Sequence, residues 1–205
     1  TNKDGKVVYL YANDAEAQYQ YIEAAKNKGY DVLLMDCPLD SHYVGLLEQK
    51  IENSVFARVD SDVIEKIVVK DEVKAPEMTD DEKKHLKEVF TSMLPEGNNY
   101  EVVMESLGET APAINITQSE FMRRWRDMAA GGGGGMSFYG DMPASYNVTV
   151  NGDSAVIKKV QGAEGGISAD SELLRQVTDL ALLSAGLLKG KALNEFIKRC
   201  EELLK

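Results

Sequence analysis

The first sixty residues alternate between short apolar runs and amphipathic segments. The elements that this pattern predicts are strands at 6–12, 30–35 and 54–59 and helices at 15–28 and 41–50. Asn13 and Asp14 are suited to cap the first helix, and Gly29 is suited to end it. Strands and helices in this order imply right-handed crossovers, so a small parallel α/β/α subdomain is expected.

The pattern changes after Asp60. Residues 60–78 mix charged and β-branched side chains, and Pro76 stands just before a new helix-start signal. We therefore place a domain boundary in this run, which gives domains of 1–72 and 73–205.

The second domain opens with Thr79 and Glu82, which have the spacing of a capping box. An apolar helical stripe follows and stops at Pro95; it consists of Leu86, Val89, Phe90, Met93 and Leu94. Strands are predicted at 100–106, 112–117 and 145–150. A second capping box, Thr117 with Glu120, predicts a helix that runs into the five glycines at 131–135.

The last third of the chain predicts two amphipathic helices with a short connection at Gly190. The first stripe is Leu173, Leu174, Val177, Leu180, Ala181, Ser184, Leu187 and Leu188, and the second is Leu193, Phe196, Ile197, Cys200, Leu203 and Leu204. A lone helical hairpin cannot cover both stripes, so it must pack on its own domain or on a second copy, and a two-fold dimer is the commonest closure. The predicted fold class is therefore α/β followed by α+β, a mixed sheet-and-helix domain that ends in this hairpin.

Composition narrows the choice of partners. The 205 residues carry a net charge of −11, which argues against binding to nucleic acid or to anionic membrane. Two distant cysteines, Cys37 and Cys200, favour a reducing compartment, so a cytoplasmic location is expected. No apolar run approaches the ~20 residues of a membrane span. The start, TNKDGKVVYL, has no signal-peptide pattern and no initiator Met, which suggests a fragment of a longer protein.

Chemical motifs are weak. The stretch from Gly186 to Ala192 resembles a phosphate loop but is one residue short and follows a helix. His42 and His85 have no cysteine at metal-ligand spacing. Cys37 and His42 are conceivable as nucleophile and base, but a turn at Cys37-Pro38 is the simpler interpretation. We therefore expect neither a metal nor a catalytic site, and no enzyme activity.

Four segments, in order, resemble the ninety-kilodalton heat-shock chaperone family, most closely its bacterial type. They are KNKGYDVLLMDCPLD (26–40), ETAPAINIT (109–117), EFMRRWRDMA (120–129) and the closing LLRQVTDLALLSAGLL with ALNEFIKRCEELL. The resemblance implies that 1–72 is the end of the middle domain and that 73–205 is the C-terminal dimerisation domain. The ending EELLK lacks the acidic pentapeptide of eukaryotic cytosolic members, which also favours the bacterial type.

The resemblance also implies a function. The family's ATP and Mg belong to an upstream ATPase domain, so this fragment should hold no cofactor. The family's final helices form a homodimeric four-helix bundle, which assigns the interface to Leu173, Leu174, Val177, Leu180, Leu187, Leu188, Leu193, Phe196, Ile197, Cys200, Leu203 and Leu204. Unfolded client proteins are the implied partners.

The helix predicted after Thr117 is the candidate for client contact. Its apolar residues are Phe121, Met122, Trp125 and Met128, and leaving large apolar side chains in water costs roughly 1.5–3 kcal/mol each. Such a face usually binds something, although packing on its own sheet would also explain it. Two other hypotheses stay open: a dimeric adaptor with one specific partner, and a small α/β enzyme that uses Cys37 or the first sheet.

Overall fold

The computed structural model describes residues 1–2, 4–37, 39–68, 78–119, 122, 143–163 and 166–204. Two compact units are present. The described part of the first unit comprises residues up to 68 together with 117–119 and 122, and that of the second comprises 78–116 and 143–204. Each unit has hydrophobic clusters of its own. The broad prediction of an α/β chain is confirmed.

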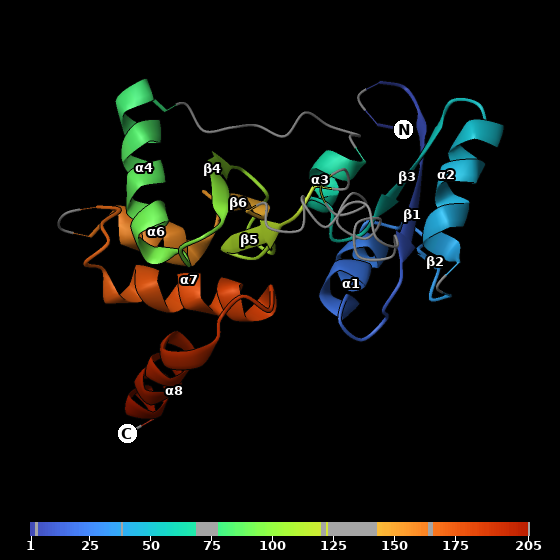
Figure 1. Cartoon of the computed structure of the whole chain (residues 1–205). Helices are drawn as coiled ribbons and strands as arrows, with labels where there is room; N and C mark the ends of the chain where they lie inside the picture. Colours follow the sequence, from blue (N-terminus) through green and yellow to red (C-terminus); the bar gives the residue numbers. More distant parts are fainter. Residues whose placement is uncertain are drawn as a thin grey trace. The chain divides into compact units, whose positions relative to one another are not determined.

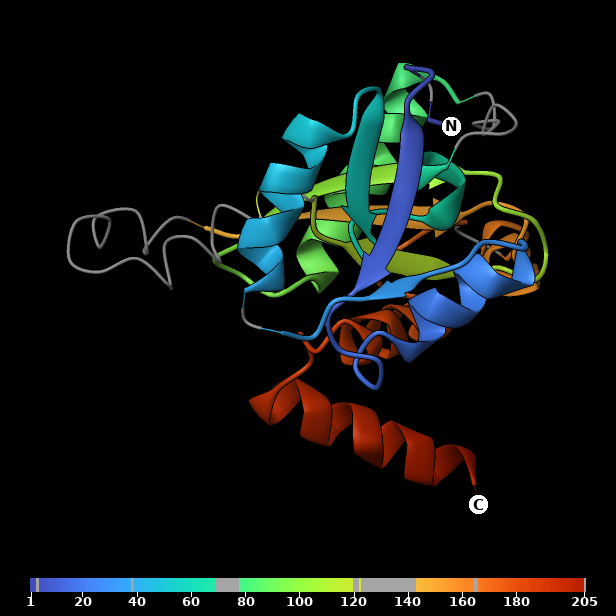
Figure 2. The same ribbon diagram turned by 90° about the vertical axis from the view of Figure 1, so that its right-hand side faces the viewer.

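The first unit alternates strands and helices as predicted. In chain order its elements are β1 (Val7–Ala12), α1 (Tyr19–Asn27), β2 (Leu33–Leu34), α2 (Asp40–Lys50), β3 (Ser54–Arg58) and α3 (Ile64–Ile67). The strands form a parallel sheet in the order β2-β1-β3. Residues on β1 alternate between two clusters, because successive side chains of a strand point to opposite faces. Leu10 and Ala12 join the α1 and α3 side, and Tyr11 packs with Val44 of α2, so helices cover both faces of the sheet (Figure 2).

Two boundaries in this unit differ from the prediction. Helix α1 begins at Tyr19 rather than at residue 15, because the Asp14 carboxylate accepts hydrogen bonds from the Glu16 and Ala17 amides and closes a separate turn. Strand β2 is two residues long instead of six. The expected end at Gly29 is confirmed: its φ is 77°, its N–H donates to the Lys26 carbonyl, and the Tyr30 N–H donates to the Ala25 carbonyl.

The second unit combines a sheet with four helices within its described residues. Its elements in chain order are α4 (Asp80–Met93), β4 (Asn99–Glu105), β5 (Ile114–Thr117), β6 (Ser145–Asn151), α6 (Ala155–Gln161), α7 (Glu172–Ser184) and α8 (Gly190–Leu203). Helices α7 and α8 are the predicted hairpin (Figure 1). The strand order is β4-β6-β5, with β4 and β6 parallel. Helix α6 was not predicted from the sequence.

The capping box that opens α4 is confirmed. The Thr79 side chain accepts from the Glu82 amide, and the Glu82 carboxylate accepts from the Thr79 N–H. Leu86, Val89 and Phe90 are buried, as their spacing predicted. They join strand residues and Leu174 of α7 in one cluster, so the hairpin is anchored on the core of this unit.

Candidate functional site

The helical hairpin α7–α8 is positioned by the loop between its helices. Helix α7 ends at Ser184, and Gly186 takes a φ of 70° just after it. The amides of Leu187 and Leu188 then donate to the Leu182 carbonyl at 2.8 and 3.2 Å. Figures 1 and 2 show α8 projecting from this loop, on the far side of α7 from the sheet of its unit. The stretch that resembled a phosphate loop is therefore a connection between two helices.

The predicted apolar stripes divide into an inward and an outward set. Leu174, Leu188 and Phe196 are buried in the core of the second unit. The half-buried residues packed against the same core are Val177, Leu187, Leu193 and Cys200. The outward set consists of Leu173, Leu180, Ile197, Leu203 and Leu204 from the prediction, together with Leu183. We call these six exposed residues the outer apolar face.

The exposure of this face increases toward the end of the chain. Leu180 and Ile197 expose 49% and 45% of their surface, whereas Leu203 and Leu204 expose 76% and 87%. Single exposed leucines are ordinary, but six large exposed aliphatic side chains on two neighbouring helices are typical of an interaction site. Leu183 was missed from the sequence because it lies beside the stripe, three residues beyond Leu180 on the helix.

A polar cluster joins the two helices of the hairpin. The Arg199 guanidinium donates through Nη2 to the Asp179 carboxylate and through Nε to Gln176 Oε1, at 3.2 Å. Gln176 Nε2 in turn donates to the Cys200 sulfur at 3.1 Å. The guanidinium carbon also lies 6.0 Å from the centre of the Phe196 ring. Burial raises the pKa of Asp179, and the charge of Arg199 opposes that rise.

The predicted client-contact helix falls almost entirely outside the described residues. Phe121, Trp125 and Met128 lie outside them, as do the glycines at 131–135. Met122 is described: it is half-buried, and its N–H lies 3.4 Å from the Ser119 hydroxyl oxygen that accepts from it. The client-contact residues therefore stay a prediction.

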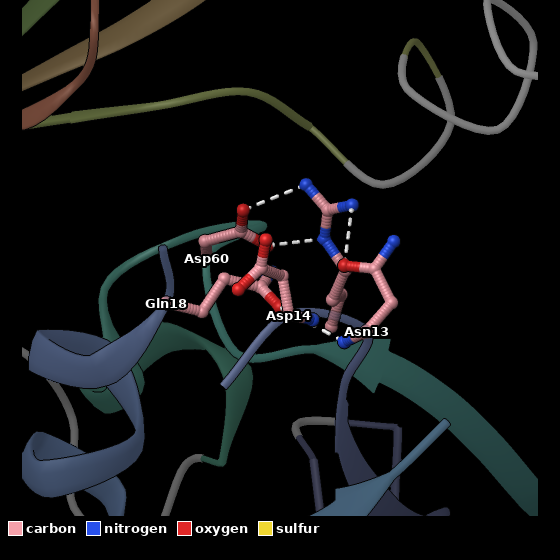
Figure 3. A network of polar contacts seen from close by, with 5 residues as sticks. Asn13, Asp14, Gln18 and Asp60 are labelled. Carbon is pink, nitrogen blue, oxygen red and sulfur yellow. Dashed lines mark hydrogen bonds and ion pairs between the residues drawn. The ribbon is translucent and has the colours of Figure 1, made fainter. Parts of the chain in front are cut away.

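A second polar cluster lies at the carboxyl edge of the first sheet, where α/β proteins often bind ligands. Figure 3 shows Asn13, Asp14, Gln18 and Asp60 gathered there. The Arg58 guanidinium at the end of β3 donates to both Asp60 oxygens, at 2.5 and 2.6 Å. Gln18 Oε1 accepts from the amides of Asn13 and Asp14 at 2.9 and 3.1 Å. Because Asp60 neutralises Arg58, the cluster is suited to fixing the loop after β1 rather than to holding an anion.

The structure gives no catalytic or metal-binding arrangement to the described side chains among the other candidates from the sequence. Cys37 is exposed, and its N–H donates to Asp40 Oδ2 at 3.0 Å in the turn that leads into α2. His85 Nε2 lies 2.8 Å from the Ile167 carbonyl oxygen in the second unit, and the side chain of His42 lies outside the description. In the described part of the chain, no group of three or more His, Cys, Asp or Glu side chains is placed to hold a metal. None of the described helices is both long and apolar enough to span a bilayer.

Comparison with known proteins gives a consistent result. The chain is 39% identical to the chaperone protein HtpG of Porphyromonas gingivalis, 35% to that of Bacteroides thetaiotaomicron and 36% to that of Bacteroides fragilis. Each match covers 100% of this chain and 39% of the relative. The alignments span 269 positions against 205 residues here, so the relatives carry insertions within the matched region. No family model matches the chain.

These relatives settle the question that the four sequence segments raised. The similarity extends over all of the chain, and relatives from three species of two genera carry the same name. The resemblance to the ninety-kilodalton heat-shock chaperones is therefore confirmed, and the chain is, over its whole length, a homologue of part of the bacterial HtpG chaperones.

Proposed function

We propose that this chain is the part of a molecular chaperone that forms its homodimer and supplies part of its contact surface for unfolded client proteins. The matched relatives are named chaperones, and the chain spans about two fifths of their length (39%). They do not favour the alternative of an adaptor with one specific partner. In this proposal ATP binding and hydrolysis belong to other parts of the protein, and the cytoplasm is its location, which suits the free thiols of Cys37 and Cys200.

The outer apolar face is the observation that carries the dimer proposal. It runs along both helices of the hairpin and includes the most exposed leucines of the chain's last turn, Leu203 and Leu204. A second copy offers a face of the same length and composition, and a two-fold axis lets each hairpin cover the other. Four helices then pack as a bundle, with the outer residues between copies and the inward residues, such as Leu174, holding each hairpin to its own unit.

Client contact is assigned to Phe121, Met122, Trp125 and Met128 on the basis of the sequence. A surface that includes methionine repacks easily against different partners, which suits a chaperone. Replacing Phe121, Trp125 and Met128 by serine is expected to weaken binding of a denatured model protein and to leave the dimer intact. Loss of folding without any effect on client binding would contradict this assignment.

The dimer proposal is tested by sedimentation velocity across a dilution series. The parent chain is expected to sediment as a dimer at micromolar concentration. Leu180→Ser is expected to raise the dimer dissociation constant roughly 10- to 100-fold. Each copy loses part of the roughly 1.5–3 kcal/mol gained by burying a leucine, and both copies of the symmetric dimer carry the substitution. Leu46→Ser is the matched control, since Leu46 is an exposed helical leucine of the first unit, with 52% exposure. A parent chain that stays monomeric would overturn the proposal.

A further inference from the structure

We infer that Gln176, Asp179 and Arg199 form a latch that holds α8 against α7, so that both helices present the outer apolar face together to a second copy of the chain. This inference rests on the proposed homodimer. It assigns to three polar side chains a positioning role that the apolar pattern of the sequence did not indicate.

The need for a latch follows from how little of α8 is buried. Within α8, which is described over its full length, Phe196 is the one buried residue. Leu193 and Cys200 are half-buried on the same side. A helix of 14 residues is marginal in water by itself. One buried ring and two partial contacts attach α8 to its unit, so few apolar contacts restrain its rotation about its own axis.

The polar contacts between α7 and α8 restrain the rotation of α8. Gln176 and Asp179 are three residues apart on α7, so they lie next to each other on one side of that helix. Arg199 reaches both of them, with Nε on Gln176 and Nη2 on Asp179. Because the guanidinium is planar and its donors diverge at fixed angles, the two contacts restrain Arg199 more tightly than a single ion pair would. Gln176 also contacts Cys200, the next residue along α8.

The latch restrains the rotation of α8 about its own axis, and this rotation sets the direction of the outer apolar face. A turn of α8 by one residue position, about 100°, would change the direction in which Ile197 and Leu204 point relative to the exposed leucines of α7. The pair is also well shielded, since the side chains of Arg199 and Asp179 expose 26% and 14%. Shielded ion pairs add little net stability and are better suited to selecting one geometry. This agrees with a positioning role.

The test uses the full chain and two measurements. The first is the dimer dissociation constant by sedimentation, and the second is amide hydrogen exchange in α8, measured also at the lowest workable concentration. Asp179→Asn is expected to raise the dissociation constant at least tenfold and to speed exchange across α8, while exchange in α4 stays unchanged. The double variant Asp179→Arg with Arg199→Asp exchanges the two charges. It is expected to restore part of the dimer affinity and part of the exchange protection of α8, whereas either substitution alone restores neither.

A matched control lies on the same helix. Lys191 and Glu195 form an ion pair at 3.6 Å with side-chain exposures of 90% and 49%. Glu195→Gln removes a similar charge that takes no part in the hydrogen bonds of the latch and acts on Asp179 only by a minor repulsion through space. It is expected to leave the dissociation constant and the exchange of α8 within twofold of the parent.

The outcomes separate the latch from the dimer. If the parent is a dimer and Asp179→Asn changes neither measurement, or changes them no more than Glu195→Gln, the latch is overturned and the dimer stands. If the parent is monomeric at every concentration but Asp179→Asn still speeds exchange in α8, the dimer proposal is overturned, and with it the latch's role toward a second copy. A parallel loss of protection throughout the second unit would show a general effect on folding and would also overturn the positioning role.

Discussion

Asn151, at the end of β6, closes the loop between β4 and β5 with one side chain. It is fully buried. Its Oδ1 accepts from the amides of Leu107 and Asp153, both at 3.1 Å, and its Nδ2 donates to the carbonyls of Gly108 and Ala111 at 2.8 and 3.2 Å. Both donors and both acceptor positions of the amide are therefore used, which is the condition for burying such a group without penalty.

Removing this side chain should be costly for the second unit. Asn151→Ala is expected to lower its free energy of unfolding by about 2–4 kcal/mol, because several backbone groups lose partners worth about 1 kcal/mol each and some stay buried. Urea unfolding of the variant measures the change. Asn147→Ala, on the same strand but half-buried, is the control and should change stability by less than about 0.5 kcal/mol. Equal losses in the two variants would contradict this account.

Glu82 gives a prediction for pH at the start of α4. Hydrogen bonds from the Thr79 N–H, at 2.7 Å, and from its hydroxyl, at 2.9 Å, lower the pKa of the Glu82 carboxyl. The folded pKa is then below the unfolded one, so the stabilisation is present above the unfolded pKa and is lost as the pH falls through the folded pKa.

Thermal unfolding checks this sign. Glu82→Ala should lower the melting temperature at pH 7 and have a smaller effect at pH 3, where the parent has lost the same stabilisation. Glu82→Gln is the control, because an amide still accepts in a capping box but does not ionise; its melting temperature relative to Glu82→Ala should not depend on pH. A Glu82→Ala effect that is larger at pH 3 than at pH 7 would contradict the assignment.

Two glycines of the first unit, one after a helix and one inside a helix, test the backbone contribution of glycine to its stability. Gly29 follows α1 with a φ of 77°, and Gly45 lies inside α2; a Cβ at either position would meet nothing within 4 Å. Any effect of alanine is therefore a backbone effect. Gly29→Ala should cost about 1 kcal/mol, since a side chain disfavours this left-handed conformation. Gly45→Ala should stabilise by about 0.5–1 kcal/mol. Chemical denaturation of both variants gives the signs, and a stabilising Gly29→Ala would refute the role of Gly29 as a helix terminator.

At the scale of elements, periodicity predicted most long helices and strands and failed where elements are short. Helices α3 and α6 span 4 and 7 residues, too few turns for a periodic stripe to be distinct. The start of α1 was misplaced because Asp14 caps a turn, and sequence alone does not distinguish an Asx turn from a helix cap. The strand predicted at 30–35 is shorter because Tyr30 completes the helix end instead of pairing.

The hairpin shows a further limit of the same kind. Its stripes were predicted as apolar, and the structure divides them between the core and the outer apolar face. A hydrophobic residue carries no mark of which surface it meets, so Leu173 and Leu174 look alike in sequence although one is exposed and the other buried. The latch residues were missed because a polar residue at the edge of a stripe usually faces solvent. Only the positions of the neighbouring helices in the folded unit distinguish a buried from an exposed leucine, or a bonded from a solvated polar side chain.

At the scale of the whole molecule, the two units should respond differently to protein concentration. The first has clusters around β1, and the second has a core that joins α4, the sheet and the hairpin. The outer apolar face belongs to the second unit, and association stabilises only the folded state that it binds. A dimer formed there should therefore raise the unfolding temperature of the second unit as the concentration rises, and leave that of the first unchanged.

Scanning calorimetry at two concentrations a hundredfold apart measures this difference. For a two-fold dimer, each tenfold rise in protein concentration stabilises the dimer against unfolding by about 1.4 kcal/mol. This corresponds to a rise of several degrees in the unfolding temperature of a domain of this size. Gly45→Ala identifies the transition of the first unit by shifting it upward, and Asn151→Ala identifies that of the second by shifting it downward. Leu180→Ser should abolish the concentration dependence of the second transition. If the first transition moved with concentration instead, the association surface would lie in the α/β unit, and the hairpin would need another partner to cover its leucines.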